Sequence, residues 1–224
     1  MVDDDDRTAL PRTHPVGVDV QPMLEGRNRL TTAFRFFLAL PHTILVGGPI
    51  AVITSVSWTT EHGWKFEYGS GGLLGMVACF CAIVAWFAIV FGGRYPEGLW
   101  KLATFYLRWR VRATTYLMLL RDEYPPFGDG EYPAELAIEM PQGPRDRMTV
   151  FFRIFLAIPH LFVLWLLSIV WAFTTAFAWI AILLTGRYPE SLYGYALGVF
   201  AWGIRVEAYM LLLRDEYPPF TLRT

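Results

Sequence analysis

Charge is scarce in this sequence, and its scarcity is uneven. Charged residues make up 17% of the chain and hydrophobic residues 54%, whereas soluble domains contain roughly 25% charged residues. Residues 73–91 and 160–185 contain no Asp, Glu, Lys or Arg at all. A membrane-crossing helix needs about 20 mostly apolar residues. These two runs therefore predict an integral membrane protein.

Basic residues are too dispersed for a nucleic-acid surface. Many of them flank the apolar runs, as residues at a membrane edge do: Arg27, Arg29, Arg94, Arg145, Arg147 and Arg187. Acidic residues gather instead within residues 3–6 and 122–146. This pattern favours a bilayer containing anionic lipid as the partner, and not a nucleic acid.

Cysteine is almost absent. Cys79 and Cys81 are the two in the chain, and both lie in one apolar run without a metal-ligand spacing around them. His42 and His160 could form a metal pair only with further ligands, which no histidine-rich or His-Glu spacing supplies. We therefore predict no metal site and no cofactor.

Catalytic patterns are also missing. The sequence has no glycine-rich phosphate loop, no Ser-His-Asp set and no paired carboxylates inside an apolar run. The acidic residues 3–6 do not follow the basic-then-apolar order of a cleavable signal peptide. We expect a protein that is not an enzyme and whose first membrane segment serves as its own insertion signal.

One long motif occurs twice. Residues 121–127, Arg-Asp-Glu-Tyr-Pro-Pro-Phe, return unchanged as residues 214–220. Upstream, a shift of 118 residues superimposes Arg29 on Arg147, and further along a shift of 93 superimposes Arg94 on Arg187. The shifts differ by 25 residues, so the first copy contains an insertion between His42 and Arg94. Its polar part, residues 59–71, predicts an exposed loop whose Trp64 and Tyr68 suit the lipid headgroup zone.

The duplication defines the domain organisation. Each repeat begins with a short arm of alternating apolar residues, 16–20 and 134–138, which predicts a β-strand. The two arms could pair as a small ribbon outside the bilayer, and that pairing would require both to lie on one side. The predicted units are a flexible acidic N-terminus, repeat 1, a linker, repeat 2 and a tail, at residues 1–13, 14–127, 128–131, 132–220 and 221–224.

The number of membrane crossings is ambiguous. Five runs are candidates: residues 41–58, 73–91, 99–120, 160–185 and 192–213. The first should kink or be partly irregular at Gly47-Gly48-Pro49. If both arms lie on the same side of the membrane, each repeat must cross the membrane an even number of times. Either helix 99–120 lies flat on the membrane, or residues 153–185 fold as two short legs. We predict an all-α membrane protein of two tandem, kinked transmembrane hairpins with short β arms, with four crossings preferred and up to six allowed.

Basic residues also predict an orientation. Arginines near the N-terminus (Arg7, Arg12, Arg27 and Arg29) and between the helices of the two repeats (Arg145 and Arg147) favour a cytoplasmic location for both segments. Repeat 1 would then expose the loop around Trp64 on the other side. The predicted location is the bacterial inner membrane.

Two arginine–histidine pairs precede a helix interruption. Arg35 and Arg153 lie one or two turns before Pro41-His42 and Pro159-His160, and proline should interrupt the helix there. Such a pair could bind an anionic headgroup or substrate. The alternative, which we favour, is an arginine anchor that reaches the phosphate layer at the membrane edge.

The helix at residues 99–120 carries three central arginines. Arg108 and Arg112 share a polar stripe, Arg110 lies off it, and Arg205 is the equivalent of Arg112 in repeat 2. A central Arg facing lipid costs about 3 kcal/mol on insertion scales. These arginines could line an anion path, bind anionic lipid, or pair with Glu207 or with acids of another subunit.

The two motif ends carry a tyrosine each. Tyr124 and Tyr217 stand in the Tyr-Pro-Pro-Phe segments, which are typical of a rigid helix exit with a local ion pair. A docking site for a partner protein is the functional alternative.

Three paired signatures resemble one bacterial family. They are Phe-Arg-x-Phe-Leu-Ala-x-Pro-His, Arg-Tyr-Pro-Glu and Leu-Leu-Arg-Asp-Glu-Tyr-Pro-Pro-Phe, each present twice. They resemble the integral membrane family known as domain of unknown function 4389, in two tandem copies. The resemblance implies a bacterial inner-membrane protein and implies no activity.

Two functions remain open at this point. We expect a non-catalytic membrane scaffold or accessory subunit of a larger complex, with lipid and other membrane subunits as partners. The alternative is a small anion or lipid transporter or channel that uses the arginine-bearing helix.

Overall fold

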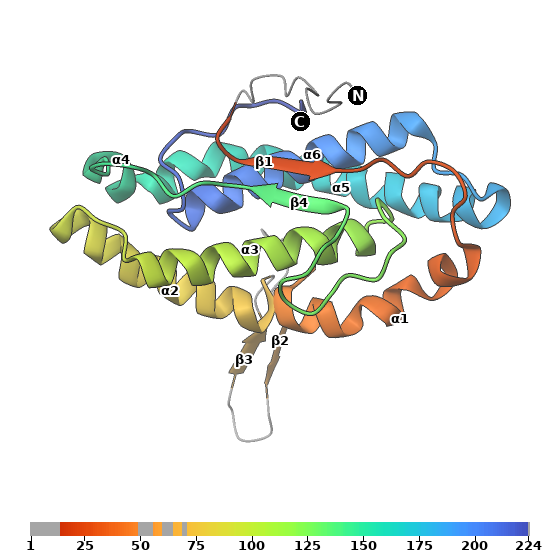
Figure 1. The fold of residues 1–224 in the computed structure, drawn as a ribbon, viewed down its shortest axis with the longest axis horizontal. Coiled ribbons are helices and arrows are strands. Elements are labelled where there is room, and N and C mark those ends of the chain that lie inside the picture. Colours follow the sequence, from red (N-terminus) through yellow and green to blue (C-terminus); the bar gives the residue numbers. More distant parts are fainter. Residues whose placement is uncertain (1–13, 49–55, 60–64, 69–70, 224) are drawn as a thin grey trace, which may run out of the picture.

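The computed structural model describes residues 14–48, 56–59, 65–68 and 71–223. These residues form six helices and four short strands (Figure 1): β1 (Gly17–Val20), α1 (Arg29–Val46), β2 (Val56–Thr59), β3 (Lys65–Tyr68), α2 (Gly72–Gly92), α3 (Glu97–Leu117), β4 (Ala134–Ala137), α4 (Arg147–Phe151), α5 (Arg153–Thr185) and α6 (Glu190–Met210). The mostly helical class predicted from the sequence is confirmed, with two small two-stranded sheets.

Within each repeat the apolar helices pack on one central helix, and the apolar helices of the two repeats run antiparallel. In repeat 1, α1 and α2 pack on α3, and in repeat 2, α5 packs on α6. The Trp86 side chain in α2 donates to the Val150 carbonyl in α4 at 3.2 Å. Its equivalent, Trp179, donates from the end of α5 to the Thr32 carbonyl near the start of α1 at 2.9 Å. The start of each apolar helix therefore lies against the end of the other.

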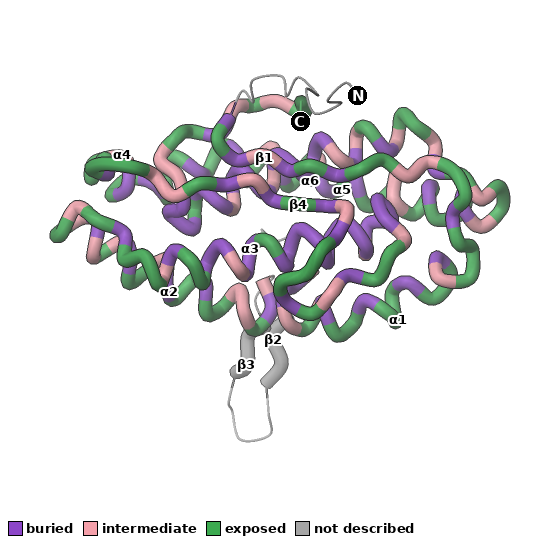
Figure 2. Tube along the Cα trace, viewed as in Figure 1, coloured by how far each residue is buried: buried purple, intermediate pink, exposed green. Residues whose placement is uncertain are grey.

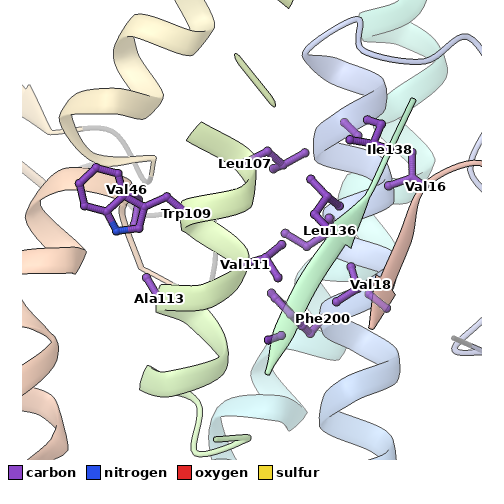
Figure 3. Packing of buried hydrophobic residues seen from close by; sticks show 14 of the residues in the cluster. Val16, Val18, Val46, Leu107, Trp109, Val111, Ala113, Leu136, Ile138 and Phe200 are labelled. Carbon is purple, nitrogen blue, oxygen red and sulfur yellow. The ribbon is translucent and has the colours of Figure 1, made fainter. Parts of the chain in front are cut away.

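The predicted arms pair across the repeats. β1 is antiparallel to β4, and Val18 lies opposite Leu136. These two residues are also equivalent by the shift of 118, so a local two-fold axis passes through this pair. Figure 3 shows Leu107 and Val111 of α3 beside Leu136 of this ribbon. The ribbon thus lies along the sides of α3 and α6, and not beyond their ends.

The insertion in repeat 1 splits a helix that is continuous in repeat 2. Val46 and Gly72 correspond to Leu164 and Trp165, which are neighbours within α5. Gly72 has φ of +67°, and a Cβ on it would lie 2.5 Å from the Gly47 nitrogen. The ends of α1 and α2 therefore meet at a point where only glycine fits.

Two sequence predictions for the insertion need correction. The run 41–58 was expected to be one membrane span with a kink or an irregular part, but α1 ends at Val46, and β2 at residues 56–59 belongs to an antiparallel hairpin with β3. The polar stretch was expected to be a loop, whereas β3 lies within it because its residues pair with β2. Trp64 and the acidic N-terminus lie outside the described residues.

The expected interruption at Pro-His is also wrong. Pro41 lies inside α1, and Pro159 lies inside α5. A proline removes one backbone donor, but the turns on both sides keep their own hydrogen bonds. The histidines that follow are therefore positioned by a helix.

Most of the exposed large apolar side chains of the described residues lie on the apolar helices α1, α2 and α5. α3 and α6 form the centre, while α1, α2 and α5 each bury one stripe and expose the rest (Figure 2). α2 and α5 are the described helices long and apolar enough to cross a membrane, and only 22% and 28% of their most apolar windows are buried. A core helix of a soluble protein would be mostly buried, so this exposure fits a membrane-associated surface.

Candidate functional site

Arg35 and Arg153 point into the protein. Each is only 2% exposed. Arg35 donates to the carbonyls of Tyr116 and Arg121 and pairs with Asp122 at 2.5 Å. Hydrogen bonds to these carbonyls at the end of α3 satisfy acceptors that a helix C-terminus leaves open.

The second repeat repeats this arrangement. Arg153 donates to the carbonyls of Tyr209 and Arg214 at 3.0 and 2.7 Å, and to Asp215 at 2.7 Å. Its guanidinium also lies 4.2 Å from the centre of the Tyr209 ring, a cation–π contact. The predicted membrane-edge anchors are thus engaged inside the fold, and the repeated Arg-Asp of the motif supplies their partners.

Arg27 and Arg145 complete the two arginine clusters. Leu119 and Leu212 adopt left-handed conformations, with φ of +65° and +62°, which cost an L-residue about 1–2 kcal/mol. Arg27 donates to the Leu119 carbonyl at 2.5 Å, and Arg145 to the Leu212 carbonyl at 2.7 Å. The sequence placed these arginines at the membrane edge. Arg27 and Arg145 are equivalent by the shift of 118, and this equivalence was the sequence signal that both repeats use an arginine at this position.

Asp215 is held as a carboxylate by two arginines. Burial alone would raise its pKa, but hydrogen bonds and charge from Arg145 and Arg153 outweigh burial and lower the pKa below its usual range. Arg145 contacts it at 2.6 Å. The cluster is therefore an internal ion pair at neutral pH.

His42 and His160 join the motif ends to the apolar helices. Trp109 donates its indole N–H to His42 Nδ1 at 3.0 Å, and the His42 ring stacks on Phe127 at 4.4 Å. In repeat 2, Trp202 donates to His160 at 3.2 Å, and the ring stacks on Phe220 at 4.0 Å. Each histidine is therefore an acceptor in an aromatic contact.

The motif tyrosines lie beside the same histidines. Tyr124 lies 5.0 Å from His42 and Tyr217 lies 4.7 Å from His160, measured between ring centres. Both tyrosines stay partly exposed. No group of three or more metal-ligating side chains occurs among the described residues.

The arginines of α3 point to different partners. Arg108 is exposed, and Arg112 donates to the Gly128 carbonyl at 2.8 Å. Arg205, the equivalent of Arg112, donates to the Arg223 carbonyl at 2.6 Å. Arg110 pairs with Glu207 of the other repeat at 2.8 Å, one of the alternatives that the sequence left open. The arginines therefore do not converge on one path.

A pocket of about 590 Å³ lies between the repeats. Its walls come from α2, α3, α5 and α6 and are mostly apolar, with Phe80, Trp165 and Trp171 among them. Its polar groups include Arg110, Glu207 and Tyr106. Tyr106 donates to Glu207 at 2.7 Å. The pocket thus combines apolar walls with an internally paired charge.

The fold defines a duplicated helical protein with apolar helices of membrane-crossing length. It belongs to the family described as Domain of unknown function (DUF4389), whose model matches residues 71–128 and 147–221, more than half of the chain. The two matched segments confirm the resemblance and its two copies. The first match begins where the insertion ends. No curated protein and no solved structure matches the chain.

Proposed function

We propose that the chain is a non-catalytic scaffold or accessory subunit of a larger complex in the bacterial inner membrane. One observation carries this proposal. The described surface is broad and apolar on α1, α2, α4 and α5, while the buried arginines bind carbonyls and carboxylates of their own chain. Such a molecule has a large apolar surface for lipid and neighbouring subunits, and its buried arginines are already bound within the chain.

A membrane location belongs to the same proposal. Apolar helices and flanking arginines support a membrane location, with the N-terminus in the cytoplasm. Four crossings are the number predicted from the sequence. The antiparallel packing of the two repeats argues against four crossings. Crossing helices would place the two Gly-Arg-Tyr-Pro-Glu turns on opposite sides of the bilayer, whereas the paired arms require both repeats to begin on one side.

The test is purification from native membranes in a gentle detergent, followed by identification of stoichiometric partners. We expect a partner to copurify with the wild-type chain. Arg108→Glu reverses an exposed charge on α3 and should weaken the complex if that helix is the contact. Ser191→Glu, at an exposed position of α6, is a control for surface charge. A single monodisperse species without a stoichiometric partner would contradict the proposal.

A lipid or anion transporter is the second candidate. The pocket between the repeats is the observation that favours it, because its apolar walls meet the Arg110–Glu207 pair. In liposomes, Glu207→Gln should then change flux while the protein stays folded. Absence of flux in the wild type would remove this candidate.

A further inference from the structure

We propose that the chain lies in one leaflet of the membrane and does not cross it. The inserted surface, here named the lipid face, consists of the exposed apolar side chains of α1, α2, α4 and α5, such as Phe34, Phe37, Phe80, Phe87, Phe155 and Phe173. The partner is a lipid bilayer with anionic headgroups. This inference rests on the proposed membrane location and specifies its geometry.

The described helices of the lipid face carry no exposed charge between their ends. Within residues 30–46, 72–92 and 148–185, the charged side chains are Arg35 and Arg153, and both are buried. Helices that lie in a membrane interface bury an apolar face by about 5–10 Å and keep polar groups on the other side. The described helices meet that requirement along their whole length.

The ribbon of β1 and β4 argues against crossing. It packs on α3 and α6, alongside these helices, and presents the exposed carboxylates of Asp19 and Glu135. If the helices crossed the bilayer, these carboxylates would lie at membrane depth. A charge at mid-bilayer costs about 3 kcal/mol, and the open edges of a two-stranded sheet are not tolerated in lipid. A flat orientation places the ribbon in water.

The length of α5 agrees with this orientation. Its 33 residues extend about 50 Å, whereas the hydrocarbon core is roughly 30 Å thick. Exposed apolar side chains continue from Ile154 to Leu184. A crossing helix would leave part of this apolar length in water, but a helix that lies flat covers all of it with lipid.

Arginines stand at both ends of the lipid face. Arg29 approaches Gly186, and Arg147 approaches Gly93, so each end joins residues of both repeats. Arg94 and Arg187 are both exposed at the same turns, and Arg187 Nε lies 3.5 Å from Glu25 Oε1. Arginines at the rim of an apolar surface can reach lipid phosphates. Exposed acids stand beside these arginines as well, such as Glu25, Glu97 and Glu190, so the attraction to an anionic membrane comes from individual arginines and not from a difference in net charge between two faces.

Single cysteines test the orientation. In a Cys79→Ala, Cys81→Ala background, the variants are Gly98→Cys, Ser191→Cys and Glu135→Cys. The first two are equivalent exposed positions at opposite ends of the molecule, and the third is on the ribbon. Inside-out and right-side-out vesicles of native membrane are treated with a membrane-impermeant maleimide. We expect all three cysteines to react in inside-out vesicles and none in the other preparation.

Other labelling patterns would overturn the inference. Crossing helices would place Gly98→Cys and Ser191→Cys on opposite sides, and two parallel hairpins would place Glu135→Cys opposite both. If Gly98→Cys misfolds, the neighbouring pair Glu97→Cys and Glu190→Cys replaces it.

The wild-type chain supplies a further check. Cys79 is exposed on α2 and should react only after detergent is added. Its reaction in intact vesicles would show that lipid does not cover this face. Flotation of the vesicles separates the two proposals: a chain that does not float contradicts the membrane location itself, whereas a floating chain with another labelling pattern contradicts only the flat orientation.

Discussion

The apolar helix of repeat 2 is continuous, and that of repeat 1 is divided. α5 extends over 33 residues, whereas residues 47–71 separate α1 from α2. The buried stripe is nevertheless the same, because equivalent positions face inward in both repeats: Arg35, Ala39, His42, Ala85 and Ile89, and Arg153, Ala157, His160, Ala178 and Ile182. Packing against α3 and α6 fixes these helices, so an unbroken backbone is not required.

The anchors of the stripe should be the most sensitive positions in both repeats. Replacing Arg35 or Arg153 by Leu leaves several carbonyls without their donor and removes one of the two arginines that pair with the half-buried Asp122 or Asp215. We expect each change to lower the free energy of unfolding by about 3–5 kcal/mol. Thermal unfolding in detergent measures this loss, with the exposed Arg108→Leu as control. A large loss in one repeat only would show that the copies do not use equivalent anchors.

The helix junction should be the next most sensitive position. Gly72→Ala places a Cβ at a positive φ and against the backbone of Leu45 and Gly47. The expected destabilisation is about 3 kcal/mol. Gly98→Ala is the matched control, because a Cβ there meets no atom within 4 Å. Equal stability of both variants would mean that α1 and α2 do not meet at this point.

Acidification should weaken the cluster around Asp215. A lowered pKa means that the carboxylate stabilises the folded protein above the unfolded pKa of about 3.9. That stability is lost as pH falls through the lower folded pKa. Asp215→Asn should cost about 2 kcal/mol at pH 7 and lose less than the wild type on acidification. Thermal unfolding of both proteins is followed from pH 7 down to about pH 2, well below the unfolded pKa, and parallel pH dependence of the two would contradict this.

A deletion of the insertion tests the comparison between the divided and the continuous helix. Its expected effect on stability is the smallest of the four. Removing residues 47–71 joins Val46 to Gly72, as Leu164 joins Trp165 in α5. We expect the variant to fold. Gly72→Ala should then stabilise it by about 1 kcal/mol, because glycine is unfavourable inside a helix. The same substitution thus changes sign between the two backgrounds. Destabilisation in both would contradict a continuous α1–α2 helix.

Several features could be predicted from the sequence because they follow from local spacing. The repeat shifts, the two arms and the class of fold are examples. The pairing of Val18 with Leu136 also agrees, since equivalent residues must meet on a two-fold axis. The family resemblance depended on the same repeated motifs.

Other features depend on long-range packing that spacing does not determine. Helical periodicity places Arg35 on a face, but it does not say whether that face meets lipid or the Tyr116 and Arg121 carbonyls. The antiparallel packing of the two repeats depends on contacts such as that of Trp179 with Thr32. These residues lie 147 positions apart, and no sequence pattern indicates that they meet. The pairing of Glu207 with Arg110 was the exception, because a carboxylate in an apolar helix is expected to pair with a cation.

The central claim is that both repeats present the same face to lipid. Phe80 and Phe173 are equivalent, and both are well exposed on that face. A photoreactive phenylalanine analogue at either position, irradiated in native membranes and analysed by mass spectrometry, tests the claim most directly. We predict lipid adducts at both positions and none with the same analogue at Glu135. Adducts to polypeptide alone, or lipid adducts at Glu135, would contradict the account.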